Sequence, residues 1–368
     1  MQTYIHERSG WPTFPYDAVA LLAGLERVGT KRGRLFGVLE ALGFEGMQER
    51  DLAALTEELI KSNAIEGDRL DPEAVRSSVA RRLGIDRGGV PEKSSYVDGL
   101  VEMAMDVAQR YQEPLTAERI FNWHAALFPT GRNVFGPIKV GTWRDDAAGP
   151  MVVASKVPGQ EVVHFQAPAA ERLPAETARF LAWIEAENEP SLIVKAGIAH
   201  LWFETLHPLD DGNGRVGRNI IDLLLARADQ IPHRPYSLSP QIYRKRNEYY
   251  DLLEASQKGS GDCTEWLVWF LDRLADAVDE AIEQATQAIS RTRFWNAHQG
   301  VPLNDRQRKV ISRLLMGWEG KMTNNKYAKL TDCSDASAAR DLAELVSRGI
   351  LSRSGGGRST AYEIIVDA

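Results

Sequence analysis

The stretch 207–218 reads His207-Pro208-Leu209-Asp210-Asp211-Gly212-Asn213-Gly214-Arg215-Val216-Gly217-Arg218. Pro208 disfavours the α conformation of the residue before it, so we expect the preceding helix to end there. The glycines at 212 and 214 allow left-handed backbone, which turns successive N–H groups toward one point and favours an anion. The two arginines follow at i and i+3, on one face of a helix whose positive N-terminal end meets the same anion. The stretch therefore predicts a polyphosphate site beside a histidine base.

Three other interpretations of this stretch are weaker. Its glycines satisfy the G-x-G-x-x-G pattern of dinucleotide-binding folds, but that pattern needs a strand before it. Residues 191–206 have helical spacing instead, with polar interruptions at Lys195, His200 and Glu204. One histidine and two adjacent carboxylates make a poor ligand set for a zinc site. One carboxylate is a normal ligand for a magnesium ion that substrate phosphates carry. A plain polar turn explains each residue singly but not the set.

The chain as a whole has the composition of a folded, water-soluble protein. It has 368 residues, 43% of them hydrophobic and 26% charged, which predicts two or three globular domains. The first residues lack a basic start leading into an apolar run, and no stretch is apolar over a membrane's width, so we expect a cytoplasmic protein without membrane contact. Cys263 and Cys333 stand far apart and are expected to be free thiols.

Helical periodicity dominates, which predicts a mainly α fold. Apolar residues recur at spacings of three and four in ten segments: 18–42, 51–61, 72–83, 97–111, 116–128, 175–187, 191–206, 215–228, 243–257 and 264–292. Two β-rich runs, 150–154 and 161–165, flank a Pro-Gly-Gln turn and predict one hairpin. Residues 84–93 and 296–303 are the expected linkers.

The last segment has a pattern of its own. Helical periodicity at 305–316, 324–330 and 334–348 is followed by two short strands around Gly355-Gly356-Gly357, which is the order of a winged helix. Ser334, Ser337 and Arg340 would lead a recognition helix. Residues 301–368 carry 11 Lys/Arg against 8 Asp/Glu, and Asp335 and Asp341 would face DNA phosphates. DNA binding stays open, against protein docking or dimerisation.

The motif 207–218 resembles the signature of the Fic family, H-x-F-x-D/E-G-N-G-R-x-x-R, with Leu209 in place of the usual phenylalanine. The resemblance extends from the 116–128 helix through Gly141-Thr142-Trp143-Arg144 and the 151–165 hairpin to the helix with Tyr249 and Tyr250. It implies a mainly α protein in three parts: an N-terminal helical region at 1–90, a Fic-fold core with a β-hairpin flap at 91–295, and a C-terminal winged helix-turn-helix at 300–368.

The resemblance also implies a reaction and roles for residues. Most Fic proteins transfer AMP from ATP to a Ser, Thr or Tyr hydroxyl of a protein. His207 would be the general base, Asp211 would hold Mg²⁺, and the target would add a strand beside the flap residues Met151, Val152, Val153 and Ala154. The expected partners are a target protein, which can be the enzyme itself, and a second copy of the chain. The nucleotide would be bound by Gly212, Asn213, Gly214, Arg215, Val216, Gly217, Arg218, Tyr249, Tyr250 and Gln257.

The sextet Ser62-Asn63-Ala64-Ile65-Glu66-Gly67 follows a helix expected to end at Lys61. Alone it indicates a helix end with a glycine stop. It also resembles the inhibitory motif S/T-x-x-x-E-G/N of the second regulatory class of Fic proteins. That resemblance implies that Glu66 pairs with Arg218 and keeps ATP from a productive pose. Three alternatives stay open: an ATP-sensing DNA-binding regulator, an enzyme that removes AMP, and transfer of another group.

Overall fold

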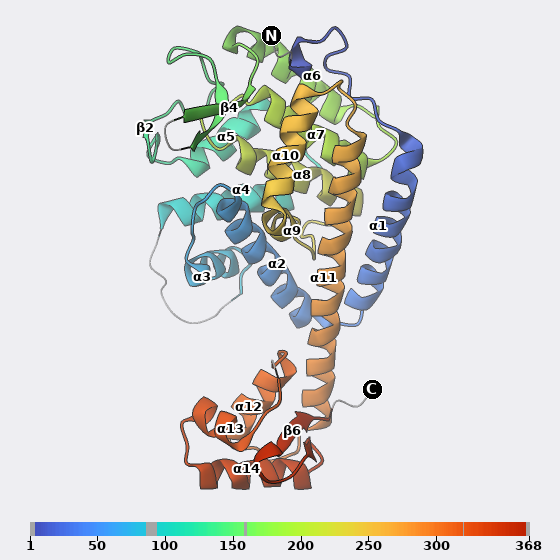
Figure 1. The fold of residues 1–368 in the computed structure, drawn as a ribbon, viewed down its shortest axis with the longest axis vertical. Coiled ribbons are helices and arrows are strands. Elements are labelled where there is room, and N and C mark those ends of the chain that lie inside the picture. Colours follow the sequence, from blue (N-terminus) through green and yellow to red (C-terminus); the bar gives the residue numbers. More distant parts are fainter. Residues whose placement is uncertain (1–3, 86–93, 158–159, 319, 366–368) are drawn as a thin grey trace. The chain divides into compact units, whose positions relative to one another are not determined.

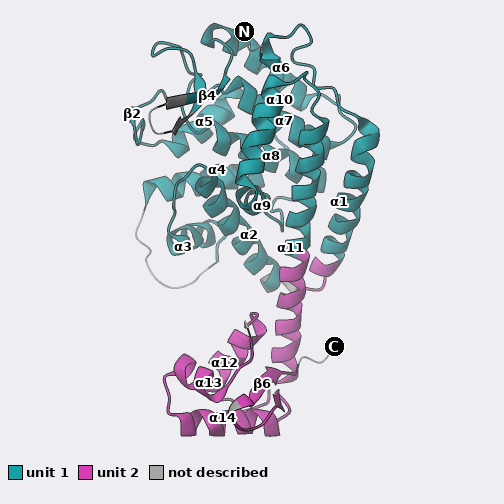
Figure 2. Ribbon diagram, in the orientation of Figure 1, with its two compact units in different colours: residues 1–37, 43–281 teal, residues 38–42, 282–368 magenta. Residues whose placement is uncertain are grey.

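The computed structural model of the chain describes residues 4–85, 94–157, 160–318 and 320–365 (Figure 1). The chain divides into two compact units (Figure 2). The first unit comprises residues 1–37 and 43–281, and the second comprises residues 38–42 and 282–368. The N-terminal helices and the motif 207–218 therefore belong to the same unit.

The first unit is built almost entirely from helices, which confirms the mainly α fold. No described helix combines the length and the apolar character that crossing a bilayer requires. The helices that begin in this unit are α1 (Ala18–Leu39), α2 (Gly43–Ile65), α3 (Pro72–Arg82), α4 (Ser95–Gln109), α5 (Ala117–Leu127), α6 (Leu173–Glu185), α7 (Leu192–Leu206), α8 (Asn213–Asp229), α9 (Ser239–Arg244), α10 (Arg246–Lys258) and α11 (Thr264–Ala297).

Several helices begin at residues whose side chains cap them. The Ser94 hydroxyl accepts a hydrogen bond from the Val97 amide at the start of α4, and the Thr116 hydroxyl accepts one from the Arg119 amide at the start of α5. Each cap satisfies an amide that has no partner inside the helix, and its loss costs about 1 kcal/mol. These local signals explain why the boundaries of both helices follow from sequence.

Helix α7 lies at the centre of the first unit and packs along α8. Every residue of α7 from Ile193 to Leu206 is buried. Trp266 of α11 donates its indole N–H to the Gly197 carbonyl at 2.8 Å. A Cβ on Gly197 would lie 2.7 Å from the Leu267 side chain and 3.2 Å from the Phe270 ring, so glycine favours this close approach of α7 and α11. The motif 207–218 thus begins on an element held rigidly from several sides.

Two of the two-stranded sheets among the described residues lie in the first unit. Strands β1 (Arg132–Asn133) and β2 (Gly136–Pro137) form a small hairpin. Strands β3 (Val152–Val157) and β4 (Gln160–Gln166) pair antiparallel, with a bulge after Val153, and form the hairpin expected at 150–165. Part of its expected turn, residues 158–159, lies outside the described residues. Phe165 of β4 is 1% exposed and anchors the hairpin in the core.

The structure differs from the sequence-based expectation in several places, among them the start of α2 at Gly43 instead of residue 51 and the end of α11 at Ala297 instead of residue 292. Helix α2 continues to Ile65 instead of ending at Lys61, because Asn63 turns its side-chain amide back onto the Leu59 carbonyl at 2.8 Å instead of breaking the helix. The helix expected at 243–257 is two helices, α9 and α10, which are separated at Lys245. The β1–β2 hairpin was not expected.

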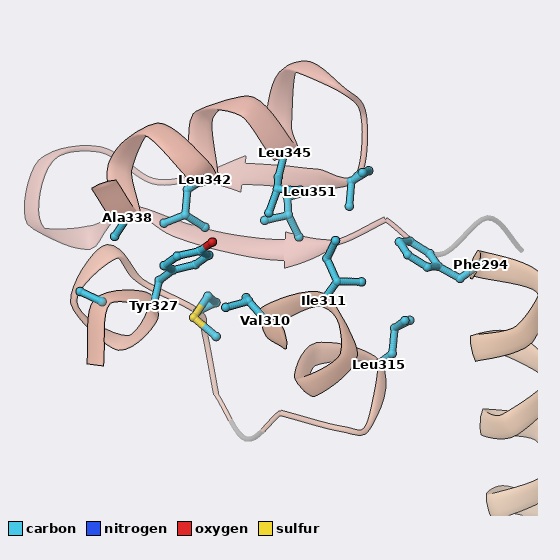
Figure 3. Packing of buried hydrophobic residues seen from close by; sticks show 12 residues of the cluster. Phe294, Val310, Ile311, Leu315, Tyr327, Ala338, Leu342, Leu345 and Leu351 are labelled. Atoms are coloured by element: carbon cyan, nitrogen blue, oxygen red, sulfur yellow. The ribbon is translucent and has the colours of Figure 1, made fainter. Parts of the chain in front are cut away.

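The second unit has its own hydrophobic core, which Figure 3 shows from close by. Its elements are α12 (Asp305–Leu315), α13 (Asn324–Thr331), α14 (Asp335–Ser347), β5 (Leu351–Ser354) and β6 (Ala361–Ile364), besides the last turns of α11. Tyr327, Leu342 and Leu345 are fully buried in this core. Three helices followed by a hairpin is the order that the winged-helix prediction requires.

One side chain of the second unit lies where the sequence did not place it. Asp341 of α14 is 6% exposed and accepts hydrogen bonds from the Arg306 guanidinium at 2.7 Å and the Tyr327 hydroxyl at 3.0 Å. The expectation that Asp341 faces DNA phosphates is therefore wrong. The helical repeat of apolar residues at 334–348 does not show that Asp341, which lies between them, points inward to the buried Tyr327.

Candidate active site

The chain leaves α7 at His207, whose φ of 44° and ψ of 55° are left-handed. Such backbone is uncommon for histidine, and the buried Arg144 holds it in place. The Arg144 Nε donates to the His207 carbonyl at 2.8 Å, and its amide donates to the Pro208 carbonyl at 2.9 Å. The guanidinium also binds the Asp146 carboxylate at 2.6 Å. Arg144 thus fixes the end of α7 from a distant segment.

The turn between α7 and α8 is closed by local contacts. The Asn213 side chain accepts from the Leu209 amide at 2.9 Å and donates to the Leu209 carbonyl at 2.8 Å. Leu209 is fully buried and fills the position that the family gives to phenylalanine. Gly212 has a φ of 81°, and a Cβ there would lie 3.0 Å from the Phe128 ring, so glycine is required.

Only one of the two glycines expected in left-handed backbone adopts it. Helix α8 begins at Asn213, so Gly214 is helical, and the expected left-handed turn over 212–214 is wrong in this respect. The amides of the first helical residues still lack partners within α8 and carry its positive dipole end. The surface suited to an anion is therefore the helix start itself.

Glu66 lies directly against this helix start. A Cβ built on Gly214 would lie 2.2 Å from Glu66 Oε1 and 3.1 Å from Arg218 Nη1. The carboxylate of Glu66 therefore contacts the Gly214 backbone closely, at the place where an anion would meet the open amides. Any side chain at position 214 would prevent this approach.

The guanidinium of Arg218 is 2% exposed and tied to the end of α2. Its Nη2 lies 2.8 Å from Glu66 Oε1, its Nε donates to the Ser62 hydroxyl at 2.8 Å, and Nη2 also donates to the Ser62 carbonyl at 2.8 Å. Burial lowers the pKa of Arg218, but the charge and hydrogen bond of Glu66, together with the nearby Tyr249 and Glu204, raise the pKa above its usual range. Both Ser62 and Glu66 of the sextet thus contact the second arginine of the motif.

The first arginine of the motif has different partners from the same region. Arg215 Nη1 lies 3.2 Å from Asp68 Oδ2 and donates to the Tyr96 hydroxyl at 2.7 Å. Its guanidinium also lies over the Phe128 ring, 5.2 Å from the centroid. Both arginines that the sequence assigns to phosphate are therefore engaged by carboxylates of the segment that follows α2.

His207 is chemically suited to accept a proton. Burial lowers its pKa to about 4, so the imidazole is neutral at pH 7. Its Nδ1 lies 3.8 Å from Glu204 Oε2, and burial raises the pKa of Glu204 to about 8. Both groups are thus uncharged at neutral pH, and the contact is not an ion pair there. The carboxyl of Glu204 therefore lies beside the candidate base as a neutral group.

Asp211 offers one carboxylate to a cation. Asn133 donates its amide to Oδ2 at 2.8 Å and the Gly212 amide donates to Oδ1 at 2.6 Å, while Arg215 Nη2 lies 3.6 Å from Oδ1. Within the described ranges, no three His, Cys, Asp or Glu side chains gather as a metal site. One partly exposed carboxylate fits a magnesium ion that keeps waters and takes phosphate oxygens, and does not fit a transition metal.

The other residues assigned to the nucleotide lie deeper. Val216 is fully buried, and a Cβ on Gly217 would lie 2.8 Å from the Glu204 carboxyl. Tyr249 is 1% exposed and its hydroxyl bonds to His200 Nε2 at 2.8 Å. Gln257 is also buried. Val216, Tyr249 and Gln257 thus contribute side chains to the core beside the motif 207–218.

Tyr250 differs from its neighbour because it is 38% exposed. Its hydroxyl donates to the Ile65 carbonyl at 3.2 Å, at the end of α2 beside Glu66. The guanidinium of Arg246 lies over its ring, 5.5 Å from the centroid. Tyr250 is thus a predicted nucleotide-binding residue that the structure leaves partly at the surface, near the sextet.

The expected flap is the β3–β4 hairpin. Met151, just before β3, and Val153 are half-buried, whereas Val152 and Ala154 are exposed. His164 of β4 contacts the Glu254 carboxylate of α10 at 2.7 Å, which ties the hairpin to the helix that carries Tyr249 and Tyr250. The exposed edge is available for a further strand, while Phe165 holds the other face in the core.

Sequence reasoning missed three contributors to the site, namely Asp68, Tyr96 and Asn133. Asp68 lies two residues after Glu66, and this short distance in the sequence is the signal that could have placed it in the site. Tyr96 lies on α4 and Asn133 on β1, and both reach the motif 207–218 only through the fold. Their contributions depend on contacts between distant segments.

Comparison with known proteins gives the same assignment for the middle of the chain. Residues 114–225 match the model of the Fic/DOC family, and residues 4–85 match a domain of unknown function, DUF4172. Protein adenylyltransferase Fic of Drosophila yakuba is 25% identical over 284 residues, which are 73% of this chain and 52% of that protein. The protein of the same name from Culex quinquefasciatus is 26% identical over 258 residues. The chain spans about half the length of the curated relatives it matches.

Solved structures show the same fold. A Fic family protein from Desulfovibrio desulfuricans G20 is 21% identical, covers 97% of this chain and 99% of its own, and has a TM-score of 0.57. A Fic domain containing signaling protein from Bacteroides thetaiotaomicron VPI-5482 is 19% identical and has a TM-score of 0.54, over 72% of this chain and 96% of its own. Together with the motif 207–218 and its helix–loop–helix geometry, these matches show that residues 114–225 belong to a Fic/DOC domain.

Proposed function

We propose that this protein is a protein adenylyltransferase, which transfers AMP from ATP to a Ser, Thr or Tyr hydroxyl of a target protein. The observation that carries the proposal is the arrangement of the loop between α7 and α8. The neutral imidazole of His207 lies at one end of this loop, and the start of α8, with its two arginines, lies at the other end. The relatives named protein adenylyltransferase support the same reaction, although they are about 25% identical and the match covers about half of their length.

His207 would act as the general base. Its Nδ1 lies toward Glu204, which leaves Nε2 as the nitrogen that takes the proton of the target hydroxyl. The hydroxyl oxygen forms a bond to the α-phosphorus, and the bond from that phosphorus to the bridging oxygen breaks. Pyrophosphate leaves with the electron pair, and AMP stays on the target as a phosphodiester.

The start of α8 would hold the triphosphate. Its open amides and dipole favour negative charge as it builds on the phosphate oxygens, and Arg215 and Arg218 would neutralise the terminal phosphates. A magnesium ion bound through Asp211 would shield the phosphate charge when present. These groups are fixed before substrate arrives, because Arg144 and Asn213 hold the loop.

We infer that Glu66 restrains the enzyme. Its carboxylate lies 2.8 Å from the Arg218 guanidinium and against the Gly214 backbone, so it occupies charge and space that a terminal phosphate needs. ATP that binds beside Glu66 would therefore be turned away from in-line attack. The same carboxylate could also assist removal of AMP, which would appear as loss of label from a modified target.

The target protein would dock on the flap. An extended segment beside the exposed edge of β3 would form backbone hydrogen bonds and bring its hydroxyl to the α-phosphorus. Val152, 37% exposed, and Val163, 44% exposed, leave apolar surface there for the incoming side chains. The same reaction could transfer AMP to a hydroxyl of the chain itself or of a second copy of the chain.

The test of this function uses the Glu66→Gly variant, ATP, Mg²⁺ and a cell lysate. Mass spectrometry should find an adenylyl group on Ser, Thr or Tyr residues of target proteins. The adducts should disappear when His207→Ala is added. Adducts of another mass would contradict AMP transfer and identify a different transferred group.

A DNA-binding role gains support from one observation. The inward orientation of Asp341 removes a negative charge from the face of α14 that Ser337 and Arg340 would present to DNA. A gel-shift assay with genomic fragments at several salt concentrations tests this role. Binding that weakens steeply with salt and is lost in Arg340→Ala would support it, and absence of any shift at low salt would reject it.

A further inference from the structure

We propose that the segment after α2 restrains both arginines of the motif 207–218, with Asp68 holding Arg215 as Glu66 holds Arg218, and that Tyr96 is a positioning residue for Arg215. The inference rests on the proposed function, because it assigns Arg215 to substrate phosphate. It adds to the Glu66 restraint a second carboxylate and a tyrosine from α4.

The end of α2 fixes the two carboxylates relative to each other. The Asp68 amide donates to the Asn63 carbonyl at 3.0 Å, and the Gly67 amide donates to the Ala64 carbonyl at 3.1 Å. Gly67 has a φ of 92°, so the helix ends in a Schellman motif with glycine at the left-handed position. Glu66 and Asp68 flank that glycine, and one rigid turn therefore presents one carboxylate to each arginine.

The arginines have a matching spacing. Arg215 and Arg218 are three residues apart on α8 and lie on one face. Asp68 Oδ2 lies 3.2 Å from Arg215 Nη1, and Glu66 Oε1 lies 2.8 Å from Arg218 Nη2. Two carboxylates thus neutralise the two cations that a triphosphate would use.

The two contacts are unequal in strength. The Asp68 side chain is 43% exposed, whereas that of Glu66 is 30% exposed, and the Asp68 contact is longer. Water and salt screen an exposed pair more strongly, so the Asp68 restraint is the weaker one. Its effect should therefore be small while Glu66 is present and clear when Glu66 is removed.

Tyr96 joins the two sides of this contact. Its hydroxyl accepts from Arg215 at 2.7 Å and can donate to Asn63 Oδ1 at 2.9 Å or to Asp68 Oδ2 at 3.1 Å. Burial raises the pKa of Tyr96 to about 12, so the hydroxyl keeps its proton at neutral pH. When Asp68 moves away, the donor can turn to Asn63 while Tyr96 continues to hold Arg215. Tyr96 would then keep the guanidinium oriented toward substrate.

The test measures ATP binding by calorimetry in the full chain with His207→Ala, so that no transfer occurs. In the Glu66→Gly background, adding Asp68→Asn should tighten ATP binding about three- to ten-fold at low salt, and the gain should shrink as salt rises. Glu73→Gln is the matched control, because it removes one exposed carboxylate from the first turn of α3. The control should change ATP affinity by less than about two-fold.

Equal ATP affinity with and without Asp68→Asn would overturn the proposal, whether or not the protein transfers AMP. Tighter binding without any transfer by the His207-containing protein would contradict the proposed function and leave the second restraint supported. Adding Tyr96→Phe to the Glu66→Gly, Asp68→Asn protein should raise the KM for ATP several-fold more than it lowers kcat. An unchanged KM would show that Tyr96 has no positioning role.

Discussion

Replacing Glu66 by glycine should activate this protein, and the size of the effect follows from the contacts of Arg218. The variant removes the 2.8 Å contact between Glu66 Oε1 and Arg218 Nη2 and opens the Gly214 backbone. A hydrogen bond between charged groups contributes about 1.5–3 kcal/mol, and the 30% exposure of Glu66 reduces this to about 1–2 kcal/mol. A substrate phosphate must break this contact before it can bind Arg218, so that free energy weakens phosphate binding.

Removing this opposition should raise kcat/KM for AMP transfer by about five- to thirty-fold. The assay follows incorporation of label from α-labelled ATP into acid-precipitable protein. The fold should survive, because Arg218 keeps its two hydrogen bonds to Ser62. Glu66→Gln serves as a second variant that keeps the side-chain shape and removes its charge. An unchanged rate in both variants, with melting temperatures close to that of the parent, would refute the restraint.

Three further predictions concern the base and the loop. Transfer should keep its rate from pH 8 down to about pH 5, because burial lowers the pKa of His207 to about 4 and the base is lost only when pH falls through that value; a profile that falls near pH 6.5 would contradict this. Leu209→Ala should lower the free energy of unfolding by about 2–5 kcal/mol, since the side chain is fully buried; a loss below about 1 kcal/mol in denaturant titration would argue against its role as the core anchor. Asn213→Ala should cost about 1–3 kcal/mol and most of the activity, because it leaves two Leu209 backbone groups unpaired; full activity in this variant would show that the loop keeps its shape without them.

The fold class and the local shape of the motif 207–218 were accessible from sequence. Proline after His207, glycine at 212 and the periodicity of 191–206 are local signals, and they predict a helix, a turn and a second helix. The end of α2 was less accessible, because Ser62 and Asn63 favour turns in general. Here the Asn63 amide bonds within the helix, and the helix continues four residues further than expected.

The non-local parts of the site could not be predicted in the same way. Arg144, Tyr96 and Asn133 are far from residues 207–218 in sequence, and nothing in their own neighbourhoods shows which loop they contact. The same holds for Asp341. Its charge suggests a surface position, but its carboxylate accepts hydrogen bonds from Arg306 and Tyr327. Sequence can name the residues with suitable chemistry, but pairing of buried charges depends on packing between elements.

The central claim is that His207 directs the adenylyl part of ATP to a protein hydroxyl. The most direct measurement compares α-labelled and γ-labelled ATP with the Glu66→Gly protein, with and without His207→Ala. We expect label on protein from the α-phosphate alone, and only when His207 is present. Label from the γ-phosphate, or α-label that persists without His207, would contradict the claim.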